Sequence, residues 1–398
     1  MAQNAQQQTQ AQSSANASNQ NALARMMVLK KSINRFQQVK AYSNVAAGTV
    51  LNTTPLFVGL LKRFIITISG TVNNTDAANS LTLSDFGLAN LLTATGPGVI
   101  YTDTQNFVRV QTQGWHLDFL HRARHRRGLG EALLNTALNV SGNYGDNFDV
   151  VVAPTAIAHG ANAAFSAVFE IPICYSDDDL RGGVFLGVVN ATSNLQLTLN
   201  PSPIAAAGAD STNAVWYGAA GNLSAVDVTI YQEYLDQLPR DSSGALILPS
   251  QDLSTIYEVK NSSFGPLTQA QDNLFPYANF RDFLSAIVVY DHDTSANAGR
   301  TGGTDVNYLT IRSANLSDIV KYTPQISAMK TRDLMRYDLP PGVYYLGSRR
   351  QPISTLNYGN MSIVLNPITA AAANVAYVGY EDFALANILG VSSQLGLA

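Results

Sequence analysis

Histidine and arginine are concentrated in one short stretch, residues 116–127, which reads HLDFLHRARHRR. His121 and His125 are four residues apart, and on a helix this spacing would present two imidazoles to one metal ion. The stretch contains no HExxH motif, however, and its four arginines would repel a cation. We therefore expect no metal site here.

The arginines of this stretch leave three interpretations open: a basic patch for phosphate or nucleic acid, a patch that contacts an acidic neighbour or lipid headgroups at an interface, or a solvated turn. Gly128 and Gly130 do not complete a dinucleotide-binding fingerprint, because Leu133 stands where a small residue is required. The candidate residues of the patch are Arg122, Arg124, Arg126 and Arg127.

Motifs for other chemistry are missing or incomplete. The run Asp177, Asp178 and Asp179 lacks the spaced oxygen ligands and the glycine of a calcium-binding loop, so an acidic turn at a strand end is the preferred interpretation, with a subunit-bridging ion left open. Cys174 is the single cysteine, which excludes an intrachain disulfide and a multi-thiolate zinc site. The sequence predicts no catalytic residue and no cofactor.

Composition points to interfaces. Charged residues make up 13% of the chain, about half of the usual ~25%, whereas 46% of the residues are hydrophobic. This balance favours closely packed interfaces and long polar loops over a strongly solvated enzyme. Neither a membrane-spanning apolar run nor a hydrophobic signal region is found, so we expect assembly in a cytoplasm.

The chain begins with what we call the N-terminal arm, residues 1–44. Its first 22 residues are a low-complexity run of Gln, Asn, Ala, Ser and Thr, which we expect to be mobile unless neighbours order it. Apolar residues then recur at steps of three and four, which predicts a short amphipathic helix through Leu23, Met26, Leu29, Ile33 and Phe36.

The charge of the N-terminal arm is purely basic, because no acidic residue precedes Asp76 in a chain of net charge −4. An anionic bilayer would attract such an arm by roughly 1 kcal/mol for each basic residue near its surface. Nucleic acid would attract the same charges, and a solvated helix that packs on its own domain is the third alternative. The residues concerned are Arg25, Lys30, Lys31, Arg35 and Lys40.

The rest of the chain alternates as β-strands do. At 398 residues the chain exceeds the ~250–300 at which single cores stop growing, so two domains are expected, over residues 45–240 and 241–398. In the first, apolar residues alternate within 64–72, 108–112, 165–173, 195–199 and 226–231; in the second, strands are expected at 286–290, 306–312, 342–346, 362–365 and 373–380. A two-sheet jelly roll accommodates the first series.

Unusual strings occur in a fixed order along the chain. The segment YQEYLDQLP (residues 231–239), with ILP and then DLSTIY (residues 252–257) after it, resembles the middle of the major capsid protein of tectiviruses, which are membrane-containing phages. The other matching strings are GWHLDF at Gly114, YSDDDL at Tyr175, TDVNYL at Thr304, SANLSD at Ser313, GVYY at Gly342, LNYGN at Leu356 and GYE at Gly379.

This resemblance implies an all-β protein with two consecutive eight-stranded viral jelly rolls and a short N-terminal helix. It implies a homotrimeric, pseudo-hexagonal capsomer that tiles an icosahedral phage shell over an internal membrane, in the virion capsid, after assembly in the host cytoplasm. The implied partners are neighbouring capsomers, minor capsid and vertex proteins and lipid headgroups, without sequence-specific nucleic acid.

The Pro-, Ala- and Gly-rich segment of residues 200–222 contains Trp216 and Tyr217. A loop of this length is usually functional or an insertion, and the resemblance implies that it rises outward as a tower of the capsomer. Two alternative functions stay open at this point: a nucleic-acid-binding module that uses the basic residues, and a carbohydrate-binding or hydrolytic jelly roll whose site is the loop with Trp216 and Tyr217.

Overall fold

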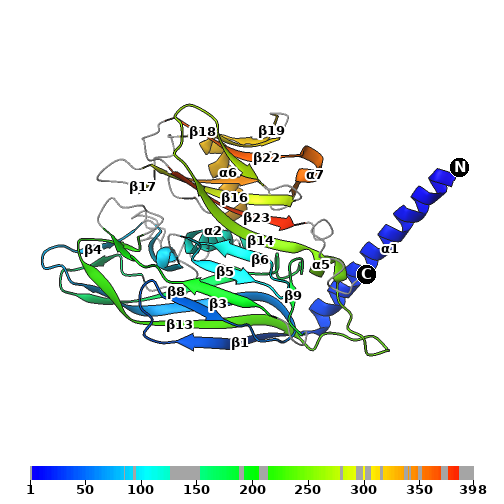
Figure 1. Cartoon of the computed structure of the whole chain (residues 1–398), viewed down its shortest axis with the longest axis horizontal. Coiled ribbons are helices and arrows are strands. Elements are labelled where there is room, and N and C mark those ends of the chain that lie inside the picture. Colours follow the sequence, from blue (N-terminus) through cyan, green and yellow to red (C-terminus); the bar gives the residue numbers. More distant parts are fainter. Residues whose placement is uncertain are drawn as a thin grey trace.

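The structure is a computed structural model. It describes residues 2–84, 86–92, 96–125, 153–187, 192–205, 214–277, 281–292, 299–300, 306–313, 317–335, 339, 342–347, 352–368 and 375–384. In Figure 1 the first half of the chain, blue to green, forms one β-rich body, and the second half, yellow-green to red, lies along its side. The helix at the N-terminus projects beyond both.

The first body has an outer sheet of long strands. Its order is β1-β13-β3-β8, with β9 also paired to β3, and every pairing is antiparallel. Alternation explains the sheet, because Phe64, Ile66 and Ile68 are fully buried while the residues between them point away from the core. The bounds are β1 Ile33–Tyr42, β13 Gly221–Asp236, β3 Leu60–Asn74, β8 Asn162–Pro172 and β9 Val184–Phe185.

A second sheet runs through both halves of the chain. Its order is β17-β16-β23-β14-β6-β5-β10-β2, and β20 and β21 also pair with β16. The bounds are β17 Gly299–Arg300, β16 Arg281–His292, β23 Val375–Ala384, β14 Ile256–Phe264, β6 Val108–Thr112, β5 Val99–Thr102, β10 Asn194–Thr198, β2 Val50–Thr53, β20 Val343–Gly347 and β21 Ile353–Ser354. The halves join where β14 pairs with β6 in parallel, at Val259 and Val110.

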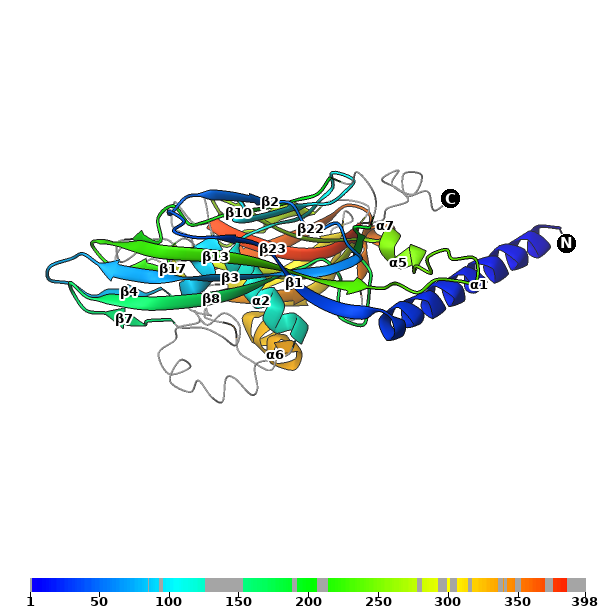
Figure 2. The same cartoon turned by 90° about the horizontal axis from the view of Figure 1, so that it is seen from below.

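Two smaller sheets complete the β-structure. The sheet β15-β22-β18-β19 closes the second body, and the sheet β11-β12-β4-β7 lies at the end of the molecule opposite the N-terminal helix (Figures 1 and 2). Their bounds are β15 Asn273–Tyr277, β22 Met361–Pro367, β18 Val306–Ser313, β19 Asp318–Tyr322, β11 Ile204–Ala205, β12 Trp216–Tyr217, β4 Leu81–Leu83 and β7 Ala156–Ile157.

Helices sit at the ends and on one side of the sheets. Helices α2 and α6 lie next to each other there, as Figure 2 shows. The helix bounds are α1 Ala2–Lys31, the 3-10 helix η1 Gly87–Leu92, α2 Gly114–His125, α5 Ser250–Ser254, α6 Pro324–Met335 and α7 Thr355–Tyr358. None of the helices in the described ranges has the length and apolarity needed to cross a membrane.

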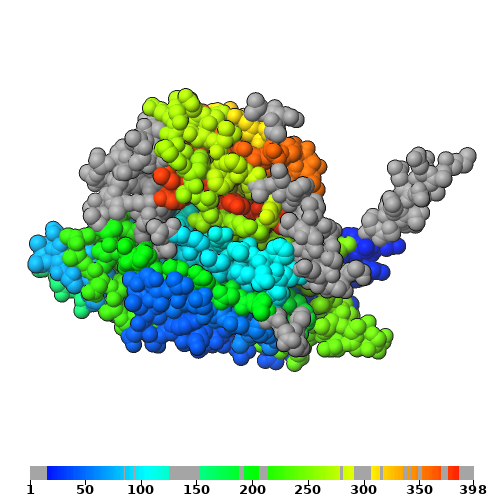
Figure 3. All heavy atoms as spheres, viewed as in Figure 1, coloured from blue at the N-terminus to red at the C-terminus, as the bar shows by residue number. Residues whose placement is uncertain are grey.

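The two bodies share their apolar core. Tyr257, Val259, Leu284 and Phe383 of the second half belong to the large core cluster of the first half. In Figure 3 the cyan atoms of the β5–β6 region lie directly against the yellow-green atoms of β14. We call this contact, formed by β6, β14, α2 and β23, the inter-roll seam.

The predicted helix of the N-terminal arm is wrong in its extent. Helix α1 begins at Ala2 and ends at Lys31, and Ile33 and Phe36 lie on strand β1 instead. Backbone pairing explains the difference: residues 33–42 pair with residues 228–236 of β13, and this ladder replaces the helical turns that the apolar spacing would allow.

Candidate assembly surfaces and the buried ionic network

Within the N-terminal arm, helix α1 is attached to the body through the carboxylate of Asp252. Arg25 donates two hydrogen bonds to Asp252 of α5, from Nε to Oδ2 at 2.5 Å and from Nη2 to Oδ1 at 2.7 Å. Asn21 Nδ2 donates to Oδ1 of the same residue at 2.9 Å. The Asp252 side chain is 3% exposed, so these partners replace the water that a carboxylate would otherwise bind, and Arg25 serves the attachment of α1.

An apolar contact lies next to this attachment. Val28 of α1 is fully buried in a cluster with residues from the start of β3, the end of β13, the segment between β8 and β9, and α5. The other members are Leu60, Cys174, Leu180, Leu235 and Leu253. Burial raises the pKa of the Cys174 thiol to about 12, so this cysteine acts as a small apolar residue at neutral pH.

The N-terminal arm exposes four large apolar side chains. Leu23 and Met26 on α1 are 55% and 45% exposed, and Ile33 and Phe36 on β1 are 44% and 57% exposed. These are four of the five residues whose spacing predicts the apolar face of a helix. Leu23 and Met26, three residues apart on α1, lie on one side of that helix. Exposed apolar groups that neighbour each other are typical of a surface that contacts another molecule.

The other basic residues of the arm accompany these apolar groups. Lys30 and Lys31 end helix α1 and are exposed. On β1, Arg35 forms an ion pair with Asp236 at 2.6 Å, and Lys40 Nζ lies 5.8 Å from the centre of the Tyr42 ring. The predicted basic surface therefore divides into a helix end and a strand.

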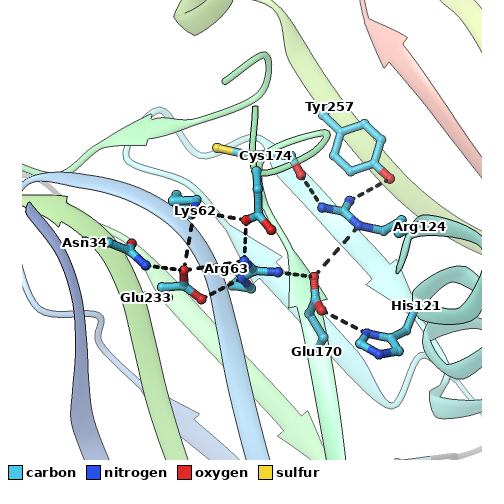
Figure 4. A network of polar contacts seen from close by, with 10 residues as sticks. Asn34, Lys62, Arg63, His121, Arg124, Glu170, Cys174, Glu233 and Tyr257 are labelled. Carbon is cyan, nitrogen blue, oxygen red and sulfur yellow. Dashed lines mark hydrogen bonds and ion pairs between the residues drawn. The ribbon is translucent and has the colours of Figure 1, made fainter. Parts of the chain in front are cut away.

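A largely buried network of charges joins strands of the first sheet (Figure 4). Arg63 of β3 is its centre: Nε donates to Glu233 at 2.7 Å, Nη1 to Glu170 at 3.2 Å, and Nη2 to Asp177. Lys62 Nζ lies 3.0 Å from Asp177 and 3.4 Å from Glu233. These contacts connect β3, β8, β13 and the turn after β8.

The strand of the arm joins the same network. Asn34 Nδ2 of β1 donates to Glu233 Oε1 at 2.8 Å (Figure 4). The hydrogen bonds from Arg63 and Asn34 lower the pKa of Glu233, although its burial acts in the opposite direction. Within the Asp177–Asp179 run, Asp177 accepts from Arg63 and Asp179 pairs with Arg181 at 2.6 Å, so both belong to ion pairs within this chain.

The arginine-rich stretch forms helix α2, and two of its arginines bind within the chain. Arg124 Nη2 donates to the Cys174 carbonyl at 2.9 Å, and its Nε lies 3.8 Å from Glu170. Arg122 pairs with Asp118 at 3.2 Å. These contacts argue against a solvated turn or a free patch at the two residues. Arg126 and Arg127 lie outside the described residues.

The histidines of α2 have structural contacts. His121 Nδ1 lies 2.9 Å from Glu170 Oε2 (Figure 4). His116 is fully enclosed against β23 and Thr112, 2.8 Å from the threonine hydroxyl, and burial lowers its pKa to about 3, so the ring is neutral. Within the ranges that the structure describes, no three His, Cys, Asp or Glu side chains are grouped as metal ligands.

The network continues across the inter-roll seam. Arg124 Nη1 donates to the Tyr257 hydroxyl of β14 at 3.4 Å, and that hydroxyl donates to Glu381 of β23 at 2.6 Å. Ser285 of β16 donates to the second oxygen of Glu381, also at 2.6 Å. A connected series of polar contacts therefore runs from the arm through the first body to the second, which fixes their relative orientation.

The Trp216 side chain lies inside the fold, and the outward placement of the segment of residues 200–222 stays a prediction. Trp216 is fully buried on β12, where its Nε1 donates to the Pro154 carbonyl at 3.1 Å and its ring packs edge-to-face on Phe165. The Pro154 carbonyl, which precedes β7 in the chain, satisfies the polar group of the buried indole. Tyr217 is half-buried beside it. A carbohydrate site at Trp216 would need an exposed ring.

Two models of a known protein family match most of this chain. The family model described as P3 major capsid protein N-terminal matches residues 2–238, and the model for the C-terminal part, P3_C, matches residues 254–394. The chain belongs to the P3 major capsid protein family. Major capsid protein P3 of Enterobacteria phage PRD1 is 38% identical over 370 residues, which cover 91% of this chain and 90% of that protein.

Solved structures share the fold of this P3 family member at low sequence identity. The major capsid protein of Sulfolobus turreted icosahedral virus is 11% identical, with a TM-score of 0.61 over 89% of this chain and 97% of its own. The VP54 structure of PBCV-1 gives a TM-score of 0.55 at 10% identity, over 89% and 94% of the two chains. The fold is a viral double jelly roll, and the protein is a phage capsid protein.

Proposed function

We propose that this capsid protein forms a homotrimeric, pseudo-hexagonal capsomer that tiles an icosahedral shell over an internal membrane, without catalysis. The observation that carries the proposal is the fusion of two similar β-bodies through one continuous sheet and one polar network. Two bodies held in one orientation give three chains a six-sided outline, which fits lattice positions with six neighbours.

The ends of the molecule suggest its orientation in such a shell. The N-terminal arm leaves at one end, and the sheet of β4 and β12 lies at the other (Figure 1). We infer that the arm faces the membrane, because its open side combines exposed Leu23 and Met26 with Lys30 and Lys31. The opposite end then faces the medium. The sides would contact neighbouring capsomers and the minor capsid and vertex proteins.

Imaging of the purified protein tests the capsomer. Electron-microscopy class averages of a trimer should show six lobes with threefold symmetry, because each chain contributes two β-bodies of similar size. Averages with only two lobes, at concentrations where the protein assembles into shells, would contradict the proposal. Shells reconstructed at subnanometre resolution would also show which end of each body faces inward.

The alternative functions gain no support from a contact in the described residues. Nucleic-acid binding by α2 would need arginines that reach outward, yet Arg122 and Arg124 bind Asp118 and Glu170 of the same chain. Carbohydrate binding at β12 would need an accessible indole, and Trp216 is fully buried.

A further inference from the structure

Two carboxylates face each other inside the second jelly roll. Glu258 of β14 and Asp382 of β23 are direct partners in the antiparallel ladder, and they are 5% and 1% exposed. The pair lies close to the end of β23 at Ala384, where Ile256 and Arg281 flank that last residue on the two neighbouring strands. Two buried carboxylates that lie directly opposite each other on neighbouring strands repel each other strongly when both are ionised.

The neighbouring cations serve the two carboxylates unequally. Arg281 of β16 forms an ion pair with Glu258, and Lys260 Nζ lies 2.7 Å from Glu258 Oε1. Asp382 Oδ2 accepts a hydrogen bond from the Tyr277 hydroxyl of β15 at 2.5 Å. Its other oxygen, Oδ1, is buried and has no hydrogen-bond partner among the described residues. Glu258 therefore has two cationic partners, whereas the hydrogen-bond donor to Asp382 is a neutral phenol.

These surroundings favour a proton on Asp382. Burial, and then the charge of Glu258, raise the pKa of Asp382 to about 7, against the opposing effects of Arg281, Tyr277 and Lys260. The phenol of Tyr380, on the same strand, is itself kept neutral by burial and by Asp382. A proton on Oδ1 removes the like-charge repulsion between Asp382 and Glu258.

We propose that Asp382 makes the β14-β23-β16 part of the sheet a pH-sensitive element, which is tightest when the side chain is protonated and loosens when it ionises. The direction of this pH dependence follows from the difference between the pKa of Asp382 in the unfolded and in the folded protein. An unfolded aspartate ionises near pH 3.8 and the folded one near 7, so stability is highest at low pH and declines as pH rises through this interval. Glu233 in the ionic network of Figure 4 has a lowered pKa and contributes the opposite dependence.

The test compares the full-length protein with Asp382→Asn, which is permanently uncharged and nearly the same size. Between pH 8 and pH 5.5 the thermal midpoint of the natural protein should rise, and amide exchange of β23, corrected for the intrinsic pH effect, should slow. Both quantities should change much less in Asp382→Asn. Exposed Asp178→Asn is the matched control and should follow the natural protein.

A second variant keeps the proposal testable if Asp382→Asn does not fold. Glu258→Gln removes the neighbouring charge, so the pH at which stability declines should move to a lower value. The carboxyl of Asp382 can also be followed directly by carbon-13 NMR of labelled aspartate. The same pH dependence in the natural protein and Asp382→Asn, no movement in Glu258→Gln, or titration of Asp382 below pH 5 would each overturn the proposal.

Discussion

Gly379 and His116 give the sharpest prediction about the inter-roll seam. Gly379 is in β23, between Asn261 of β14 and Ile287 of β16. A Cβ atom at this position would lie 2.4 Å from both Cγ and Cδ2 of the His116 ring, closer than packed atoms ever come. The imidazole ring cannot move away easily, because it is buried and hydrogen-bonded to the Thr112 hydroxyl. Gly379→Ala should therefore force the seam apart.

The expected cost follows from the size of this overlap. Inserting one carbon atom into a well-packed core typically costs about 1–3 kcal/mol, and the enclosed ring places Gly379→Ala at the upper end of that range. The free energy of unfolding should be measured by denaturant titration. Gly96→Ala is the control, because a Cβ there meets no atom within 4 Å, and it should be close to neutral.

A double-mutant cycle identifies the cause. Replacing His116 with alanine removes the atoms that Gly379→Ala would strike, so the pair should cost at least about 1 kcal/mol less than the sum of the single changes. Additive costs, or a Gly379→Ala protein as stable as the natural one, would refute the packing argument for the seam.

Three further predictions concern the arm and the ionic network. Asp252→Ala removes the hydrogen-bond acceptor of Asn21 and Arg25, so the attachment of helix α1 to the body should weaken by about 2 kcal/mol. Limited proteolysis should then cleave helix α1 faster than in the natural protein, and an unchanged rate of cleavage would contradict this. Glu233→Gln should lower the free energy of unfolding by about 1–3 kcal/mol at pH 7. The variant should also lose less stability than the natural protein below pH 4.5, because the Glu233 carboxylate, whose pKa is lowered in the fold, stabilises the fold above that pH and loses this effect as the pH falls. An acid-unfolding curve identical to that of the natural protein would argue against this. Deletion of residues 1–31 spares β1, so the protein should stay folded but bind anionic vesicles less and assemble poorly over membrane; normal assembly would exclude the proposed role of the arm.

The strands were predictable from the sequence because one period dominates them. In β3 and β8 apolar residues alternate with polar ones over many positions, and the predicted ranges 64–72 and 165–173 coincide with these strands to within a few residues. The double jelly roll itself was predicted through the resemblance of ordered strings to a family, which the comparisons confirm.

The local spacing of apolar residues gave a wrong prediction where contacts with distant parts of the chain determine the secondary structure. The three- and four-residue spacing of the arm continues past Lys31, but pairing with β13 converts the last part into a strand. Helix α2 was not predicted from the sequence, because its many charged residues interrupt the apolar pattern. Its apolar spacing at Trp115, Phe119 and Ala123, residues that pack against the second body, was the available signal.

The ionic network could not have been derived from sequence. Arg63 and Glu233 are 170 residues apart, and Arg63 and Glu170 are 107 apart, so only the strand order of the sheet brings them together. The same holds for the burial of Trp216, which depends on a small sheet of four short strands. The two domains, over residues 45–240 and 241–398, stay a prediction.

The native mass of the purified protein, measured by light scattering over a dilution series, tests the capsomer most directly. The account predicts a particle of three 42.6 kDa chains whose mass does not change on dilution. A monomer at every concentration, in protein that is shown to be folded, would contradict the trimeric capsomer.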